Sequence, residues 1–352
     1  MWRKRMMSST KWYVAAVLPL AFSVPAGAQD DAKKIVVGTL PTLSAIAEEI
    51  AGAKLVVVSL ARPDEDPHFV SPTPYLMNKV RKAELLFEIG MMQDRWADRV
   101  ADGSGNTRIT RGARGRITTS VGIPKEEVPD NPTRALGDLH PEGNPHLWLD
   151  PLRTKKIASN ITRGLVQAFP EDRDYFQKRD KDFRARIDRE VFGEELVQLV
   201  GGRKLSRLAM DGELFDWLER NEVGEEKLIR KLGGWLKKAE PLRGEKAVEY
   251  HKVWVYLCNL FGIELLGTIE EKPGIPPGPR YQREITERIK REGARLILVD
   301  NFYDAALPDA IAKQAGATVV ILPSQVGGEP GTEDYFKLID KILDHLLAAI
   351  NE

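Results

Sequence analysis

The chain has 352 residues, including 52 Lys or Arg, 52 Asp or Glu, five histidines and one cysteine. The balanced charge gives no reason to expect a nucleic acid partner, and a single cysteine, Cys258, excludes a scaffold held by internal disulfides. Because the length exceeds what one hydrophobic core usually serves, two domains are expected.

The first 28 residues have the pattern of a secretory signal peptide. A basic start, an apolar run over residues 12–24 and the small residues Ala26-Gly27-Ala28 before a cleavage point are typical of such peptides. The run is shorter than the about 20 residues that a membrane span needs, and no later segment is as apolar without charges. Removal of residues 1–28 leaves 48 basic and 52 acidic residues, and no cysteine stands at the cleavage point to carry a lipid anchor. We therefore expect a soluble periplasmic protein, acting as a monomer.

Residues 29–169 are predicted to form an N-terminal α/β lobe. Short β-rich runs alternate here with helical segments, which favours a parallel sheet. These runs are residues 34–39, 54–60 and 83–90. Asp150-Pro151 then provides an N-cap and a first-turn proline for a helix through Phe169.

Residues 170–191 are predicted to form one long helix that links two lobes rigidly. From Glu171 to Glu190 the sequence is rich in charge, contains no Gly or Pro, and has bulky apolar side chains at helical spacing. The alternative is a surface helix of a single domain.

Residues 192–352 are predicted to form a C-terminal α/β lobe with a helical insertion at about 192–244. The insertion reads as short amphipathic helices joined by glycines. Beyond it, strands alternate again with helices, and the expected strands are residues 247–250, 263–269, 295–299 and 318–322. The predicted fold class is therefore α/β, with two parallel-sheet lobes joined by one long helix.

The histidines indicate a metal site. His68, His146 and His251, with a carboxylate from residues 300–304, supply the three imidazoles and one acid that a tetrahedral transition-metal site needs. A lone loop histidine is more often polar surface. Here, however, two of the three follow a proline, which restricts the backbone, and the candidates come from loops of both lobes. The site is therefore expected in the cleft between the lobes.

The other two histidines carry less weight. His140 is most simply a loop residue, although it could also be an auxiliary ligand or a capture site. His345 lies in an amphipathic terminal helix and is expected to be structural.

Four ordered motifs make nearly all of the chain after residue 28 resemble the zinc and manganese solute-binding proteins of bacterial ABC transporters, in which one long helix joins two α/β lobes. The motifs are Asp66-Pro67-His68 with Pro72-Thr73-Pro74, Asn144-Pro145-His146-Leu147-Trp148-Leu149-Asp150-Pro151, Tyr250-His251-Lys252-Val253-Trp254, and Lys272-Pro273-Gly274-Ile275-Pro276-Pro277. The resemblance implies a protein that captures a divalent transition metal and delivers it to an ABC transporter permease, and not an enzyme.

The resemblance also implies that His68, His146 and His251 are ligands. Family members with a carboxylate as fourth ligand place it four residues after an acidic residue that ends a strand, which corresponds to Asp304. Asp300 is the alternative, either as a ligand or as a group that orients an imidazole, and water could complete the site instead. Three imidazoles and one carboxylate suit Zn²⁺ better than Mn²⁺, which prefers more oxygen ligands. Affinity should fall in acid, because only a neutral imidazole binds a metal.

The chain departs from the family pattern twice. No long loop rich in histidine and acid lies between the first two ligands, and residues 192–244 are longer than the usual connection. This insertion could cover the cleft, contact the permease or recruit a periplasmic metallochaperone. Alternative functions are a manganese- or iron-binding homologue, an adhesin, and a zinc-dependent hydrolase in which water takes the fourth position.

Overall fold

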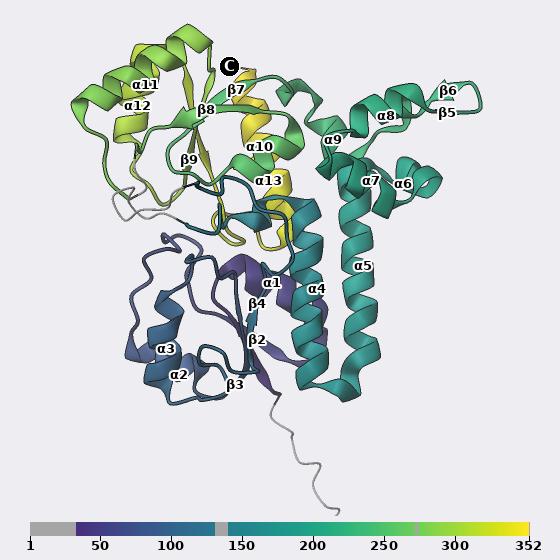
Figure 1. The fold of residues 1–352 in the computed structure, drawn as a ribbon, viewed down its shortest axis with the longest axis vertical. Coiled ribbons are helices and arrows are strands. Elements are labelled where there is room, and N and C mark those ends of the chain that lie inside the picture. The colour runs from purple at the N-terminus through teal and green to yellow at the C-terminus, as the bar shows by residue number, and fades with distance from the viewer. Residues whose placement is uncertain (1–32, 131–139, 272–273, 352) are drawn as a thin grey trace, which may run out of the picture. The chain divides into compact units, whose positions relative to one another are not determined.

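The computed structural model describes residues 33–130, 140–271 and 274–351. The predicted signal peptide of residues 1–28 therefore lies outside the described residues, as do Lys272 and Pro273 of the fourth motif. From Lys33 onward the chain forms one compact unit that contains two parallel sheets (Figure 1). Within the described ranges, no helix is long and apolar enough to cross a membrane.

The N-terminal lobe is built on a four-stranded parallel sheet with the strand order β2-β1-β3-β4. Its elements are β1 (Ile35–Gly38), α1 (Pro41–Ala51), β2 (Val56–Ser59), α2 (Pro74–Val80), β3 (Ala83–Glu88), α3 (Trp96–Ser104), β4 (Arg116–Thr118) and α4 (Pro151–Ala168). α4 begins as predicted, because the Asp150 carboxylate accepts hydrogen bonds from the backbone N–H groups of Leu152 and Arg153 and Pro151 occupies the first turn.

A single long helix, α5 (Arg173–Phe192), runs beside α4 from the level of the N-terminal sheet toward the second lobe (Figure 1). Its buried side carries apolar residues such as Phe176, Phe183 and Ile187, whereas most of its charged residues face solvent. The predicted fold class is confirmed: two parallel-sheet lobes are joined by one long helix.

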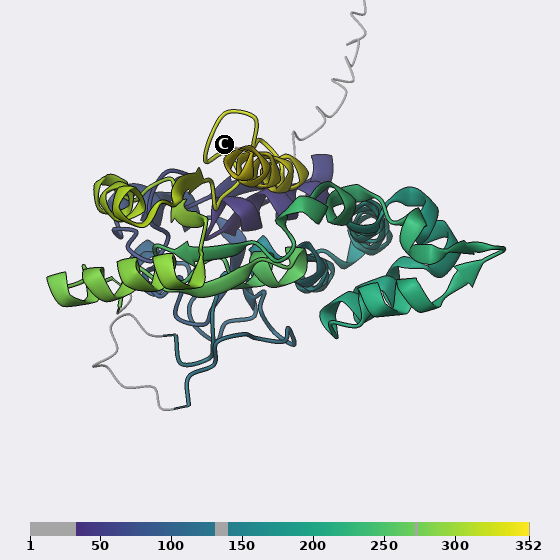
Figure 2. The same cartoon turned by 90° about the horizontal axis from the view of Figure 1, so that it is seen from above.

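After α5 the chain forms a group of short helices and a small hairpin. Its elements are α6 (Glu194–Val200), α7 (Gly202–Met210), α8 (Leu214–Arg220), β5 (Glu222–Val223), β6 (Glu226–Lys227) and α9 (Gly234–Lys238). Figures 1 and 2 show this segment beside one end of α5 and away from both sheets. At Gly234 the chain packs closely against α5 again. The φ of Gly234 is 59°, which suits glycine, and a Cβ there would clash with the carbonyl oxygen of Glu190.

The C-terminal lobe contains a second parallel sheet with the order β10-β9-β7-β8. Its elements are β7 (Lys246–Glu249), α10 (Val255–Phe261), β8 (Glu264–Thr268), α11 (Pro279–Glu292), β9 (Leu296–Asp300), α12 (Ala306–Ala315), β10 (Thr318–Leu322) and α13 (Tyr335–Ile350). Cys258 of α10 is fully buried.

The two lobes are also joined directly. One hydrophobic core continues from β1 through α5 to β9, and it includes Val37, Phe183 and Leu298. Close to it, the Nε1 of Trp148 donates to the carbonyl oxygen of Ser324 at 2.7 Å, and the Thr42 hydroxyl donates to Oε1 of Gln325 at 2.9 Å. Loops that leave the carboxyl ends of the strands in both sheets therefore meet between the lobes.

Candidate metal centre

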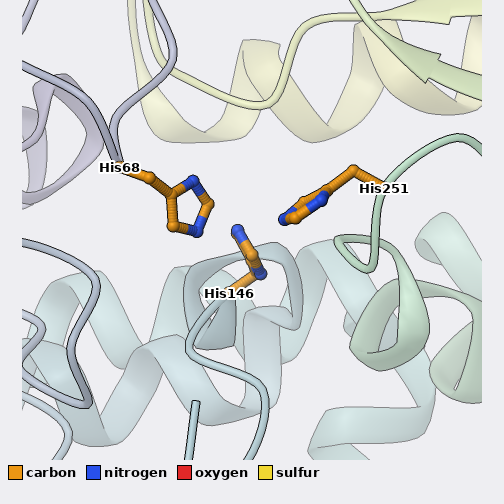
Figure 3. A group of neighbouring side chains, drawn as sticks. All are labelled: His68, His146 and His251. Carbon is orange, nitrogen blue, oxygen red and sulfur yellow. The ribbon is translucent and has the colours of Figure 1, made fainter. Parts of the chain in front are cut away.

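Three of the predicted ligands converge between the lobes: His68 and His146 from the N-terminal lobe and His251 from the C-terminal lobe (Figure 3). One ligand atom from each lies within 4.8 Å of the others. The ring centroids are 5.2 Å apart for His68 and His146, 5.3 Å for His68 and His251, and 6.1 Å for His146 and His251.

His68 is held by the aspartate two residues before it. Oδ1 of Asp66 accepts hydrogen bonds from the backbone N–H of His68 at 2.9 Å and from its ring Nδ1 at 2.8 Å. The preceding carbonyl, that of Pro67, accepts a hydrogen bond from Nε1 of Trp96 at 2.9 Å. Both the backbone and the ring of His68 are therefore fixed in the loop between β2 and α2.

His146 repeats this arrangement with an asparagine. Oδ1 of Asn144 accepts from the backbone N–H of His146 at 3.0 Å and from its Nδ1 at 2.9 Å. The Asn144 side chain also donates to the carbonyl oxygen of Lys252, next to His251, at 2.9 Å. A short helical turn, Leu147–Leu149, follows. The ring of Trp148 packs against that of His146, with the ring centroids 5.2 Å apart. The residues that hold His146 thus also contact the loop of His251.

His251 follows β7 and is 4% exposed. Its Nδ1 is 2.8 Å from Oε2 of Glu270, and the same carboxylate oxygen accepts from the backbone N–H of Gly274 at 3.1 Å. The buried Glu249 accepts from the N–H groups of Val253 and Trp254 and so closes the turn after His251.

The hydrogen bonds decide which ring nitrogen of each histidine is available. Each Nδ1 faces an oxygen acceptor, on Asp66, Asn144 or Glu270, and so carries the hydrogen in the neutral ring. The Nε2 atoms are therefore the ones that could bind a metal. Metal-binding histidines usually have this pattern, because an acceptor on one nitrogen fixes the ring and raises the basicity of the other.

Burial and neighbouring charges shift the pKa values of His146 and His251 in opposite directions. Burial lowers the pKa of His146 well below its usual value, and the nearby His68 and His251 act in the same direction. Burial also acts to lower the pKa of His251, but the hydrogen bond and charge of Glu270, with the charge of Asp300, raise it overall above the usual value. A metal must therefore displace a proton from His251 more often than from His146.

The two candidate carboxylates occupy different environments. Asp300 ends β9 and is fully buried, and within the described residues neither of its carboxylate oxygens has a hydrogen-bond partner. Burial raises the pKa of Asp300 to about 7 against the opposing influence of Ser324 and His251. Asp304 is exposed, and its Oδ1 accepts from the backbone N–H of Ala306 at 2.9 Å. The buried acid whose charge acts on His251 is therefore Asp300.

His140 also lies beside the three histidines. Its Nδ1 is 2.9 Å from the carbonyl oxygen of Met91, and its Nε2 is 3.3 Å from Nε2 of His68. Burial, together with the nearby His68, lowers the pKa of His140 to about 3. His345 is elsewhere, on α13, with its Nε2 2.9 Å from Oε1 of Glu329.

The residues that orient the imidazoles were not assigned from the sequence. Asp66 and Asn144 had a detectable signal, because each stands two residues before a histidine and can bond both its backbone and its ring. Glu270 had none, since it is 19 residues from His251 and reaches it only through the pairing of β7 with β8.

A sequence model of the family described as "Zinc-uptake complex component A periplasmic" matches residues 36–190 and 226–349 of this chain. The unmatched residues between these ranges include α6, α7, α8 and β5. The match therefore covers nearly all of both parallel sheets and of α5, and it includes the three converging histidines.

Individual relatives are more distant. The chain is 23% identical over 319 residues to the iron-binding protein YfeA of Yersinia pestis, covering 90% of this chain and 86% of that protein. It is 21% identical over 323 residues to the zinc-binding lipoprotein AdcA of Streptococcus pneumoniae, and it spans 56% of that longer protein. The crystal structure of ZnuA is similar over 90% of this chain and 98% of that chain, with a TM-score of 0.64 and 18% identity. That structural likeness supports the fold.

Proposed function

Because this chain belongs to the family of periplasmic zinc-uptake complex component A proteins, we propose that it binds one zinc ion between its lobes and delivers it to the permease of an ABC transporter. Members of this family are solute-binding proteins rather than enzymes. The ion is the cargo of such a protein, so the site needs to hold it and release it, and no chemical step follows.

The observation that carries the proposal is the convergence of three imidazoles whose Nδ1 atoms are already engaged. One ligand nitrogen from each of the three rings lies within 4.8 Å of the others, and the engaged Nδ1 atoms leave Nε2 to bind a small divalent cation. Because a protein oxygen already holds the Nδ1 of each ring, little side-chain freedom is lost when the ion binds to Nε2.

Ligand chemistry supports zinc as the cargo. Three nitrogen ligands and at most one carboxylate suit Zn²⁺, whereas Mn²⁺ favours more oxygen ligands. The names of relatives do not decide between metals, since one is called iron-binding and another zinc-binding.

The direct test is metal analysis of the purified chain, followed by calorimetric titration of the stripped protein with zinc and with manganese. We expect one zinc per chain, bound more tightly than manganese. A protein that purifies with no stoichiometric metal, or that prefers manganese, would contradict the proposal.

For the fourth ligand we propose Asp300 in preference to Asp304. Asp300 is fully buried, and among the described residues neither of its carboxylate oxygens has a hydrogen-bond donor, which is costly unless a cation neutralises the charge. That charge already acts on His251. Asp304 is exposed and its carboxylate is engaged with the start of α12.

A matched pair of substitutions separates the two acids. Asp300→Asn keeps the size of the side chain but removes its charge, so zinc affinity should fall about tenfold or more. Asp304→Asn should leave the affinity within about twofold, because it changes only an exposed hydrogen bond. Competition against a chelator of known affinity measures both. If Asp304→Asn gave the larger loss, the assignment would be reversed.

A further inference from the structure

The three converging imidazoles differ in the group that holds Nδ1. The Nδ1 atoms of His68 and His251 each lie 2.8 Å from a carboxylate oxygen, whereas that of His146 lies 2.9 Å from the neutral amide of Asn144. A carboxylate acceptor on one ring nitrogen raises the basicity of the other, and a neutral acceptor does so less because its hydrogen bond is weaker. By its direct partner alone, His146 would be the weakest zinc ligand of the three.

The amide of Asn144, however, has a carboxylate of its own. Its Oδ1 accepts from His146, and its Nδ2 donates to Oε2 of Glu127 at 2.9 Å. Asn144 is 4% exposed, and in such a buried setting the hydrogen bonds of a chain polarise one another. The negative charge of Glu127 therefore makes the amide oxygen a stronger acceptor for the imidazole of His146.

The orientation of this amide is fixed from both sides. The second hydrogen on Nδ2 of Asn144 is donated to the carbonyl oxygen of Lys252 at 2.9 Å. A carboxylate and a carbonyl can only accept, so Nδ2 must face them and Oδ1 must face His146. The ammonium group of Lys252 also lies 3.3 Å from Oε1 of Glu127, in a partly exposed ion pair. One carboxylate thus contacts the loop of His146 and the loop of the ligand from the other lobe.

The backbone at Glu127 is held in an unfavourable conformation. Its φ is 52°, which is costly for a residue other than glycine and persists only where the surroundings impose it. The residue before it is bound on two sides: the carbonyl oxygen of Glu126 accepts from the N–H of Asn144 at 2.9 Å, and its N–H donates to the hydroxyl of Tyr256 at 3.1 Å. That hydroxyl donates in turn to the carbonyl oxygen of Asn144 at 2.6 Å. The position of the Glu127 carboxylate is therefore set by the fold.

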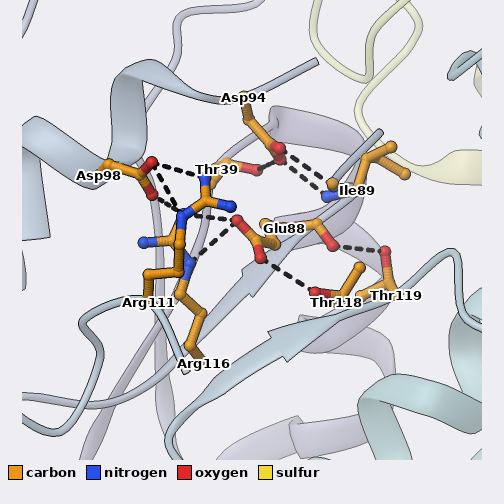
Figure 4. A network of polar contacts seen from close by, with 10 residues as sticks. Thr39, Glu88, Ile89, Asp94, Asp98, Arg111, Arg116, Thr118 and Thr119 are labelled. Atoms are coloured by element: carbon orange, nitrogen blue, oxygen red, sulfur yellow. Dashed lines mark hydrogen bonds and ion pairs between the residues drawn. The ribbon is translucent and has the colours of Figure 1, made fainter. Parts of the chain in front are cut away.

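The segment that leads to Glu127 leaves β4 from a rigid base (Figure 4). The carboxylate of Glu88 at the end of β3 accepts from the hydroxyl of Thr118 at 3.0 Å, and its carbonyl oxygen accepts from the hydroxyl of Thr119 at 2.9 Å. Further along, Nη2 of Arg153 on α4 donates to the carboxylate of the residue before Glu127 at 2.6 Å. Both ends of the segment are thus tied to the N-terminal lobe.

We infer that Glu127 is a positioning residue of the metal site, which acts on His146 through the amide of Asn144, so that each of the three imidazoles has a carboxylate behind it. The inference rests on the proposed function. Its effect is to make Nε2 of His146 a stronger ligand and so to tighten zinc binding. Because the charge of Glu127 is partly exposed and acts through an intervening amide, its effect is smaller than that of a carboxylate bonded directly to an imidazole.

The first test measures the zinc affinity of full-length variants by competition against a chelator. Glu127→Gln keeps the size of the side chain and removes its charge, so affinity should fall by about three- to tenfold, less than the about 10- to 100-fold typical of a direct partner of a ligand. The matched control is Glu142→Gln, which removes the same charge from an exposed acid that pairs with Lys125 at 3.1 Å. It should leave the affinity within about twofold. Equal losses in the two variants would overturn the inference.

Lys252→Met separates this role from a simple tie between the lobes. The substitution removes the ion pair but leaves Glu127 bonded to Asn144. Zinc affinity should then stay within about twofold, because exposed ion pairs contribute little. A loss as large as that of Glu127→Gln would mean that the ion pair alone matters, and it would overturn the inference.

The second test needs no metal. In the stripped chain carrying isotope-labelled histidine, the NMR signal of the Nδ1–H of His146 should move to higher field in Glu127→Gln, because its hydrogen bond to Asn144 weakens. The corresponding signals of His68 and His251 should stay where they are. An unmoved His146 signal would overturn the inference. Failure of the unaltered chain to bind zinc would instead overturn the proposed function, so the two failures are distinguishable.

Discussion

Replacing His251 by alanine is expected to weaken zinc binding by about 100- to 1000-fold. Zinc sites with four protein ligands are worth about 10–16 kcal/mol, so that one ligand accounts for about 3–4 kcal/mol, and 1.4 kcal/mol is a factor of ten. The loss should be at the upper end of this range, because the buried carboxylate of Glu270 would keep only its hydrogen bond from Gly274. Competition against a chelator measures the change.

The matched control for this variant is His345→Ala. His345 is the histidine on α13 that pairs with Glu329, outside the converging group. Its removal should leave zinc affinity unchanged. Equal losses from the two substitutions, or full affinity in His251→Ala, would remove His251 from the site.

Acid is expected to release the ion, with uptake of only a small number of protons for each zinc released. The pKa of His251 is raised, so in the metal-free protein it carries a proton below that pKa, and zinc must displace it. Protonation of His251 therefore lowers zinc affinity by about tenfold per pH unit once the pH is below the raised pKa of His251. The pKa of His146 is lowered well below the usual value, so His146 takes up no proton in the mildly acidic range.

The slope of log affinity against pH tests this difference. Since His146 contributes nothing, His251 and the proposed ligand Asp300, whose pKa burial raises to about 7, should give a slope between about one and two from roughly pH 7 to pH 5.5. A slope near three would mean that His146 titrates like a free imidazole, and a flat profile would mean that His251 is not a ligand. Glu270→Gln should move the onset of the loss to lower pH, because it removes the main cause of the raised pKa.

Much of the fold was predictable because local patterns and the global fold agree. The β-rich runs before and after the long helix became parallel strands, and Asp150-Pro151 started α4 through the hydrogen bonds that such a pair can make. The stretch after α5 was harder, since its short helices have no strong period and owe their position to close packing at residues such as Gly234.

The site was only partly predictable. Pro-His pairs in loops indicated His68 and His146, and a parallel sheet brings the loops after its strands to one edge. The sequence left His140 open as a loop residue or an auxiliary ligand, because its contact with His68 depends on the backbone of Met91 and joins residues 72 positions apart. Which acid turns inward, Asp300 or Asp304, likewise depends on how the loop after β9 leaves the sheet.

The continuous core between the lobes bears on how the ion leaves. If the lobes swung apart and exposed roughly 200 Å² of that apolar surface, the motion would cost about 5 kcal/mol, enough to make a spontaneously open form rarer than about one molecule in a thousand. The hydrogen bonds of Trp148 and Thr42 to residues 324–325 oppose the same motion. If the chain delivers zinc to a permease as proposed, the free energy that opens the site would have to come from docking to that permease, and the free protein would keep its ion.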